Sequence, residues 1–280
     1  MGAMPNAEVE ARVTRLAIYP VKGLGGQLLE DVEVQDRGFT WDRRWMLVGE
    51  DHRFLTQRQL PRMATIKASV TREELVLTHR NRQITVPLKP PKTAPEIQVT
   101  IWNDRVEALF LPEYGQWFSE ALHHRCDLVF MPDTTLRPVN PAFARAGDIV
   151  GFADAYPILL VGEASLADLN ARLDDPVPTD RFRPNIVVST NEPFIEDRWG
   201  EIEIGSALVC GTKASDRCSV PTVDQLTGER TGPEPIRTLA SYRRFGEGVY
   251  LGQNLTIRRT GRIALGDVVS IRSQIGAVYA

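Results

Sequence analysis

The stretch GTKASDRCSVPTVDQLTGE, residues 211–229, places one cysteine, Cys218, in polar surroundings. Charged or polar residues flank this cysteine until Val220, and Pro221 rules out a regular central strand just beyond it. A structural cysteine packs as a small hydrophobic residue, so this setting is typical of a thiol that is available for chemistry. The adjacent Arg217 favours the thiolate, which is the form that attacks carbon or binds a metal. The residues alone leave a functional and a structural role for Cys218 open.

Several uses of such a thiolate can be compared. A cysteine hydrolase needs a histidine base, but the four histidines all lie in the first half of the chain: His52, His79, His123 and His124. Distance in sequence does not exclude spatial contact, yet no hydrolase signature surrounds the cysteine. Zinc is disfavoured because there is no Cys-x-x-Cys pair and because adjacent histidines cannot share one helix face. A thiolate ligand for a softer metal centre stays open, whereas Cys126 and Cys210 adjoin apolar runs and are predicted to be structural thiols.

The composition of the chain is that of an ordinary soluble globular protein, with 280 residues of which 42% are hydrophobic and 25% charged. A net charge of −3 gives no electrostatic reason to expect nucleic acid or an anionic membrane as a partner. No apolar run approaches the roughly 20 residues that cross a bilayer, and the N-terminus is too polar for a secretory signal. Three cysteines cannot build a disulfide framework, so we expect a cytoplasmic protein.

Short runs with period-two alternation predict mainly β structure with few helices. In the first half these runs are 13–19, 28–34, 45–48, 66–70, 75–78, 84–88, 97–101 and 106–110, and the last two flank a hairpin loop. In the second half they are 156–161, 186–188, 201–204, 208–210, 255–259 and 268–271. Helices are predicted after Pro112 and over 163–173, with Ser165 as the N-cap of the second. The irregular stretch 134–147 is interpreted as a linker or a long surface loop, and the many short strands favour closed or strongly curved sheets.

The polar stretch around Cys218 is one of several separated motifs that follow one another along the chain. They are residues 182–188 (FRPNIVV), 194–199 (FIEDRW), 216–224 (DRCSVPTVD), 227–229 (TGE), 235–243 (PIRTLASYR) and 251–255 (LGQNL). These motifs resemble the MOSC domain, which is named after the C-terminal part of molybdenum cofactor sulfurases. Upstream, residues 18–23 (IYPVKG) and 42–48 (DRRWMLV) resemble the β-rich domain that precedes MOSC. The resemblance covers nearly the whole chain and implies an α+β, mainly β fold, with a β-rich N-terminal domain at 11–132 and a MOSC β-barrel with a few flanking helices at 133–280.

The relatives that this resemblance suggests are the amidoxime-reducing component proteins, and it implies a molybdenum cofactor (Mo-molybdopterin) whose metal takes Cys218 as its protein ligand. The implied activity is reduction of N-hydroxylated compounds, such as amidoximes and N-hydroxylated base analogues, by oxygen-atom removal. At the family level, the resemblance also implies pyridoxal phosphate binding. The pterin cofactor ends in a phosphate, which charge-assisted donors bind well. The resemblance implies cofactor contacts at Lys22, Arg43, Ser165, Arg183, Asn185, Asp216, Arg217 and Asn254, with Asp224 as a candidate proton donor.

The sequence departs from the family pattern at two places. Residues 214–218 read ASDRC where relatives often read PCSRC, so that Asp216 puts a carboxylate in place of a hydroxyl next to an anionic cofactor. Residues 221–224 read PTVD where the family pattern is TTVD. We expect Lys22, Arg43 and Arg183 to converge on a pocket between the two domains, where ligand sites are common.

The source of electrons and two other function classes complete the expectations. Three cysteines, one of them assigned to the metal, cannot hold an iron–sulfur cluster that takes four. Residues 23–26 (GLGG) lack the spacing of a dinucleotide fingerprint, so we expect a separate haem or iron–sulfur protein as electron donor. The alternatives are a non-catalytic cofactor carrier or sulfur-transfer module, and a β-barrel binding protein with an incidental cysteine. The sequence indicates neither the physiological substrate nor the oligomeric state.

Overall fold

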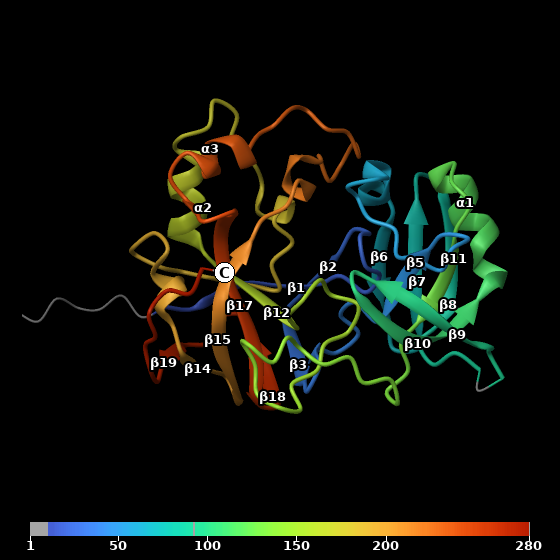
Figure 1. Ribbon diagram of the computed structural model, residues 1–280, viewed down its shortest axis with the longest axis horizontal. Helices are drawn as coiled ribbons and strands as arrows, with labels where there is room; N and C mark the ends of the chain where they lie inside the picture. Colours follow the sequence, from blue (N-terminus) through green and yellow to red (C-terminus); the bar gives the residue numbers. More distant parts are fainter. Residues whose placement is uncertain (1–10, 92, 280) are drawn as a thin grey trace, which may run out of the picture.

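The computed structural model describes residues 11–91 and 93–279 and consists mainly of β-strands, as the alternation predicted. Figure 1 shows two β-rich halves side by side, with helices α2 and α3 on one half and α1 on the other. None of the helices in this described part of the chain is long and apolar enough to span a membrane.

The larger half is built on a long, mostly antiparallel sheet, in which the one parallel pair is β12 with β13. Along the sheet the order is β19 (Val269–Ile271), β14 (Glu201–Ile204), β15 (Ala207–Asp216), β17 (Gly248–Arg259), β12 (Ile158–Gly162), β13 (Ile186–Val188), β1 (Val13–Ile18) and β2 (Gln27–Leu29), while β16 (Arg244–Phe245) pairs with β17. A separate three-stranded sheet joins β18 (Gly261–Ala264), β3 (Asp31–Gln35) and β4 (Gly38–Phe39). Their shared apolar face forms one core.

The first four strands therefore belong spatially to the C-terminal half of the chain. β1 pairs with β13, and β3 pairs with β18. The strand predicted over 28–34 is two strands, β2 and β3, which separate at Glu30 and enter different sheets. The boundary between 11–132 and 133–280 stays a prediction about folding units, and the last residue of the second range lies outside the described residues.

The smaller half holds two antiparallel sheets around its own core. One orders β5 (Trp45–Val48), β11 (Asp127–Phe130), β10 (Asp104–Leu111) and β9 (Glu96–Ile101), and the other orders β6 (Lys67–Val70), β7 (Glu74–His79) and β8 (Arg82–Pro87). The 3₁₀ helices η1 (Pro61–Thr65) and η2 (Pro112–Tyr114) and the helix α1 (Gly115–Leu122) complete it. The helix predicted after Pro112 is confirmed, and its Trp117 and Phe118 are buried in the core as its apolar spacing requires.

The prediction of an N-cap at Ser165 is wrong. Helix α2 (Glu163–Asn170) begins after Gly162, whose extended backbone forms the N-cap. Ser165 lies inside the first turn, and its hydroxyl donates to the buried carboxylate of Glu196 at 2.7 Å. The remaining short helices are η3 (Thr179–Arg181), η4 (Ile195–Arg198), η5 (Val220–Thr222) and α3 (Ile236–Ala240). The loop predicted over 134–147 is confirmed and continues without regular strands or helices to β12.

Strand β15 carries the chain to Cys218, and it does so past a tight crossing at Gly211. The register of β15 against β17 shifts between Gly211 and Lys213, which marks a bulge. A Cβ at Gly211 would overlap the carbonyl oxygen of Trp199 and press on the side chain of Gln253. A glycine in a strand often marks such a close approach of two backbones.

We expect Gly211→Ala to lower the free energy of unfolding by about 1–3 kcal/mol, because an added methyl group must displace backbone. Gly276→Ala is the matched control, since a Cβ there meets nothing within 4 Å, and we expect a change within about 0.5 kcal/mol. Urea unfolding of both variants measures the difference. Equal stability of the two variants would contradict the crowding at Gly211.

Candidate functional site

Cys218 lies just beyond the end of β15 and its side chain is exposed. The backbone before it is fixed to β17, because the N–H of Arg217 donates to the carbonyl of Val249 at 2.7 Å. The N–H of Val249 donates in return to the Asp216 carboxylate at 3.1 Å. The N–H of Val220 points at the Cys218 sulfur at 3.5 Å. An accessible thiol is therefore held on a rigid strand end. Cys126 is buried as predicted, whereas Cys210 is only half-buried.

Arg217 is the cation next to this thiol. Its guanidinium donates to the Ser215 hydroxyl and to the Phe182 carbonyl, both at 2.9 Å. Its Nε is buried and has no hydrogen-bond partner within the described ranges. Burial lowers the pKa of Arg217, while the charges of Cys218 and Asp154 raise it, and the group stays cationic at any ordinary pH. Arg217 therefore supplies a fixed positive charge near the Cys218 sulfur.

Arg43 and Arg183 meet over one aromatic ring. Their guanidinium carbons lie 4.5 and 4.2 Å from the centroid of Tyr19. Arg43 also donates to the Asn185 side chain at 2.8 Å and to the carbonyl of Arg183 at 3.2 Å. Burial lowers the pKa of Arg183 to about 10, so it remains charged near neutral pH. Both residues have left-handed backbones, with φ of 48° and 56°, and such strain concentrates at functional sites.

Lys22 joins the group through an ion pair with Asp154, with 2.5 Å between Nζ and the carboxylate oxygen. The Trp102 indole donates to the same oxygen at 3.0 Å. Lys22 is only 7% exposed, and burial lowers its pKa although Asp154 opposes the shift. Desolvation by the neighbouring protein raises the pKa of Asp154. Lys22, the hydrogen bond from the Trp102 indole and the charge of Arg58 outweigh this effect and hold the pKa below its usual range. The carboxylate therefore stays ionised.

Asp154 is held in place by the loop between the halves. Arg137 is buried and donates to the carbonyls of Gly151 and Ala153 at 3.0 and 2.6 Å and to that of Asp154 at 2.9 Å. Its Nε also bonds the Asp104 carboxylate at 2.7 Å. Sequence reasoning missed Asp154, because an aspartate in an irregular loop is most often a turn residue.

These side chains form what we call the cationic cluster: Lys22, Arg43, Arg183 and Arg217. Asp154 acts on the pKa values of Lys22, Arg183 and Arg217, and Arg43 acts on the same three, so all of them are electrostatic neighbours. They come from both ends of the sequence. A cluster of cations beside an exposed thiol suits an anionic ligand that carries a thiophilic metal, so the residues fit a metal-bearing phosphate cofactor. Their roles as its ligands stay predictions.

Two other predicted cofactor contacts, Asn185 and Ser165, have their side chains engaged within the protein. Asn185 is 1% exposed; its amide donates to the Ala17 carbonyl and accepts from Arg43 and the Leu159 N–H, so it positions Arg43. Ser165 is fully buried against Glu196 and away from any surface. Asn254 lies within β17, opposite Lys213.

Asp224 also has a structural setting. Its carboxylate accepts from the N–H groups of Leu226 and Thr227 at 2.8 and 2.9 Å and from Arg181 at 2.8 Å. The backbone bond from Thr227 is the main reason why its pKa lies below the usual range, although partial burial opposes the shift. The local geometry thus favours an ionised acceptor and not the proton donor that we expected. No hydrogen bond or ion pair joins Asp224 to the cationic cluster in the described part of the chain.

The loop that carries Asp224 ties the two halves together beside the site. Gln225 and Gln57 exchange amide hydrogen bonds of 2.9 and 3.1 Å. Gln57 also donates to the carbonyl of Gly23, next to Lys22, at 2.7 Å. This amide pair fixes the segment after Cys218 to the segment after Lys22.

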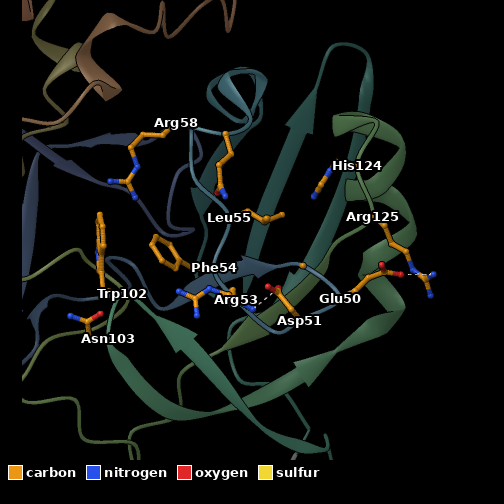
Figure 2. Close-up of a pocket in the computed structure, with 12 residues that line it drawn as sticks. Glu50, Asp51, Arg53, Phe54, Leu55, Arg58, Trp102, Asn103, His124 and Arg125 are labelled. Carbon is orange, nitrogen blue, oxygen red and sulfur yellow. Dashed lines mark hydrogen bonds and ion pairs between the residues drawn. The ribbon is translucent and has the colours of Figure 1, made fainter.

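An open pocket of about 780 Å³ lies next to the cationic cluster on the smaller half. Figure 2 shows its walls, with Trp102, Phe54 and Arg58 at one end and the Glu50–Arg125 ion pair at the other. The Trp102 indole that bonds Asp154 is thus shared by the cluster and the pocket. The searched residues, 11–91 and 93–279, contain no group of three or more His, Cys, Asp or Glu side chains that could hold a metal ion by themselves.

Comparison with known families matches two consecutive domains. Residues 10–125 match the MOSC N-terminal beta barrel domain, and residues 147–270 match the MOSC domain. Mitochondrial amidoxime-reducing component 1 of Mus musculus is 33% identical over 281 residues, covering 94% of this chain and 82% of that protein. The Homo sapiens protein of the same name is 31% identical, with 94% and 83% covered. Molybdenum cofactor sulfurase of Oryza sativa subsp. japonica is 29% identical over 90% of this chain, but only 34% of that longer protein.

We expect Asp154→Asn to reduce stability at neutral pH, because it leaves Lys22 buried beside a neutral partner. The carboxylate is 63% exposed, so the expected loss in the free energy of unfolding is only about 1–2 kcal/mol. The folded pKa of Asp154 is depressed, so this contribution is fully present above the unfolded carboxyl pKa of about 4 and disappears as the pH falls further. Urea unfolding at several pH values measures it.

Asp133→Asn serves as the control for this pH dependence. Asp133 pairs with the buried Arg44 but is itself 90% exposed, and Arg44 keeps two hydrogen bonds to the Met131 carbonyl. We expect a loss below about 0.5 kcal/mol. A loss in Asp154→Asn that is the same at pH 3 and pH 7 would show that the ion pair is not its cause.

Proposed function

The chain belongs to the MOSC family that includes the mitochondrial amidoxime-reducing components, and we propose that it is a molybdenum-cofactor-dependent oxidoreductase that reduces N-hydroxylated substrates. Amidoximes and N-hydroxylated base analogues are the substrates that we propose. The observation that carries the proposal is the exposed thiol of Cys218 at the edge of the cationic cluster. At the family level, an association with the molybdenum cofactor and an oxidoreductase-type role follow from the relatives.

Different residues would hold different parts of such a cofactor. Lys22, Arg43, Arg183 and Arg217 would bind its anionic groups, and the Cys218 thiolate would ligate its molybdenum. When bound, the cofactor would supply the two-electron chemistry that separates oxygen from nitrogen. Arg43 and Arg183 both pack on the ring of Tyr19. The hydrogen bond to Asn185 fixes the orientation of the Arg43 guanidinium. Side chains held in this way keep their geometry without further ordering when a ligand arrives.

Each N–O bond that is reduced consumes two electrons and two protons and releases water. Among the four cations, Lys22 is the one suited to passing on a proton, because burial lowers its pKa whereas guanidinium groups do not release theirs. Asp154 holds Lys22 in place and stays ionised, so it can stabilise the lysine when it is reprotonated from solvent.

A second function is favoured by one specific observation. The rice molybdenum cofactor sulfurase aligns over most of this chain, and an exposed thiol beside cations also suits a protein that carries the cofactor or transfers sulfur to it. Bound cofactor without turnover would support this alternative.

We also propose a separate electron donor and a cytoplasmic location. The sequence has three cysteines, one fewer than an iron–sulfur cluster takes, and Cys126 is buried. A small haem or iron–sulfur protein that docks near Cys218 is the partner that we propose.

Cys218→Ala is expected to abolish the reduction of benzamidoxime by the purified protein with an artificial reductant. Because the side chain is exposed, the midpoint of thermal unfolding should stay within about 2 °C of the unchanged protein. Bound molybdenum and pterin are measured in parallel, and both should fall. Cys210→Ala and Cys126→Ala are the controls and should keep turnover. Full activity in Cys218→Ala would refute the assignment of Cys218 as the molybdenum ligand.

Electron supply gives an independent test. The purified chain should reduce no benzamidoxime with NADH or NADPH alone, because residues 23–26 (GLGG) lack a dinucleotide-binding spacing. A dithionite-reduced viologen dye should drive the reaction, and the product benzamidine can be followed by chromatography. Direct turnover with NADH by the homogeneous chain would refute the need for a separate donor.

A further inference from the structure

The pocket beside Trp102 has a wall in common with the cationic cluster. Trp102 and Phe54 line the pocket, while the Trp102 indole bonds Asp154 and the Lys22 ammonium lies 5.3 Å from the centroid of Phe54. We propose that this pocket receives the body of the substrate and selects planar aromatic N-hydroxylated molecules that carry an anionic group. This inference rests on the proposed function, since it names the substrate class for that site.

The preference for an anion follows from the charges on the pocket wall. Glu50 and Arg125 neutralise each other at 2.7 Å, at the end far from Trp102. The Asp51 carboxylate accepts a hydrogen bond of 3.0 Å from the backbone N–H of Arg53, which stabilises the turn at 51–53. No carboxylate in the described ranges lies within ion-pairing distance of the Arg53 or Arg58 guanidinium. Asp154 acts on Arg58 only from beyond ion-pairing distance and is itself paired with Lys22, so the end of the pocket nearest the cluster carries more positive than negative charge.

The arginine nearest the cluster is also preorganised. The guanidinium carbon of Arg58 lies 4.2 Å from the centroid of the Trp102 ring, and its backbone carbonyl accepts a hydrogen bond from Arg230 at 2.8 Å. Figure 2 shows Arg58 and Arg53 on either side of Trp102 and Phe54. A guanidinium that is stacked in this way loses little freedom when its planar fork binds a carboxylate or phosphate.

The aromatic part of the inference rests on Trp102. Its ring lies 5.2 Å from that of Phe54, and it is 38% exposed at the pocket edge. Trp102 stands at the tip of the β9–β10 hairpin with a φ of 55°, a conformation that is costly for a bulky side chain. Despite this cost, the hairpin places the Trp102 ring between the pocket and Asp154. The volume of about 780 Å³ lies in the range of pockets that hold drug-sized ligands, so a substituted ring system fits within it.

The test compares benzamidoxime with 4-carboxybenzamidoxime, which differ only by a carboxylate on the ring. Binding is measured by calorimetry on the purified protein without reductant, and KM is measured with the dithionite-reduced dye. We expect the carboxylated probe to bind about 10-fold more tightly and to have a KM lower by about the same factor, with a similar kcat. The preference should fall as salt is added, because part of it is exposed electrostatics.

Arg58→Gln and Arg53→Gln should each remove most of this preference, measured as the ratio of the two affinities. Arg82→Gln is the matched control, since Arg82 is an exposed arginine of the same half that pairs with Glu120, and it should keep the preference. Equal binding of both probes by the unchanged protein would overturn the proposal. So would a loss of bound molybdenum in Arg58→Gln with the preference intact, because Arg58 would then belong to the cofactor site.

Failure of the proposed function has a different signature. Tighter binding of 4-carboxybenzamidoxime that is lost in Arg58→Gln, without turnover of either probe, would support the pocket and refute the reductase. Turnover of both probes with equal KM and equal affinity would support the reductase and refute the pocket.

Discussion

Four cations can share one surface in this protein because two carboxylates lie among them: Asp42, which pairs with Arg43, and Asp154. Asp154 pairs with Lys22 and acts on the pKa values of Arg183 and Arg217. Without Asp154, the like charges of the cluster would repel one another with less compensation. The loop between the halves, which looks like a linker in the sequence, supplies this carboxylate and anchors it through Arg137. The linker is therefore part of the site.

Much of the fold could be predicted because strand alternation and helix spacing are local signals. α1 and most strands follow from them directly. The pairing of β1 with β13 and of β3 with β18 could not be predicted, because alternation says which face of a strand is buried and not which distant strand it meets. The N-cap at Ser165 failed for a related reason: a distant carboxylate, Glu196, offered its hydroxyl a better partner than the helix end did.

In the candidate site, too, features with a local sequence signal could be predicted, and features that depend on distant contacts could not. The polar neighbours of Cys218 marked it as accessible, and the motif resemblance pointed to Lys22, Arg43 and Arg183, which the structure brings together. Asp154 and Trp102 carry no local signal, because their importance comes from one hydrogen bond between a loop and a hairpin tip. The resemblance implied a cofactor contact at Asn185, and the structure uses the side-chain amide of this residue within the protein, to hold Arg43.

The reciprocal bonds between Gln57 and Gln225 separate the shape of the site from its charge. Both partners are neutral amides, so neither ionic strength nor acidity near neutral pH alters the contact that seats one half on the other. The charged groups of the cationic cluster respond to ionic strength, because dissolved salt screens exposed charges. A titration with salt therefore changes the field that an incoming molecule meets while this amide contact between the halves persists. Ionic strength is thus a physical probe of how charge contributes to recognition in this protein.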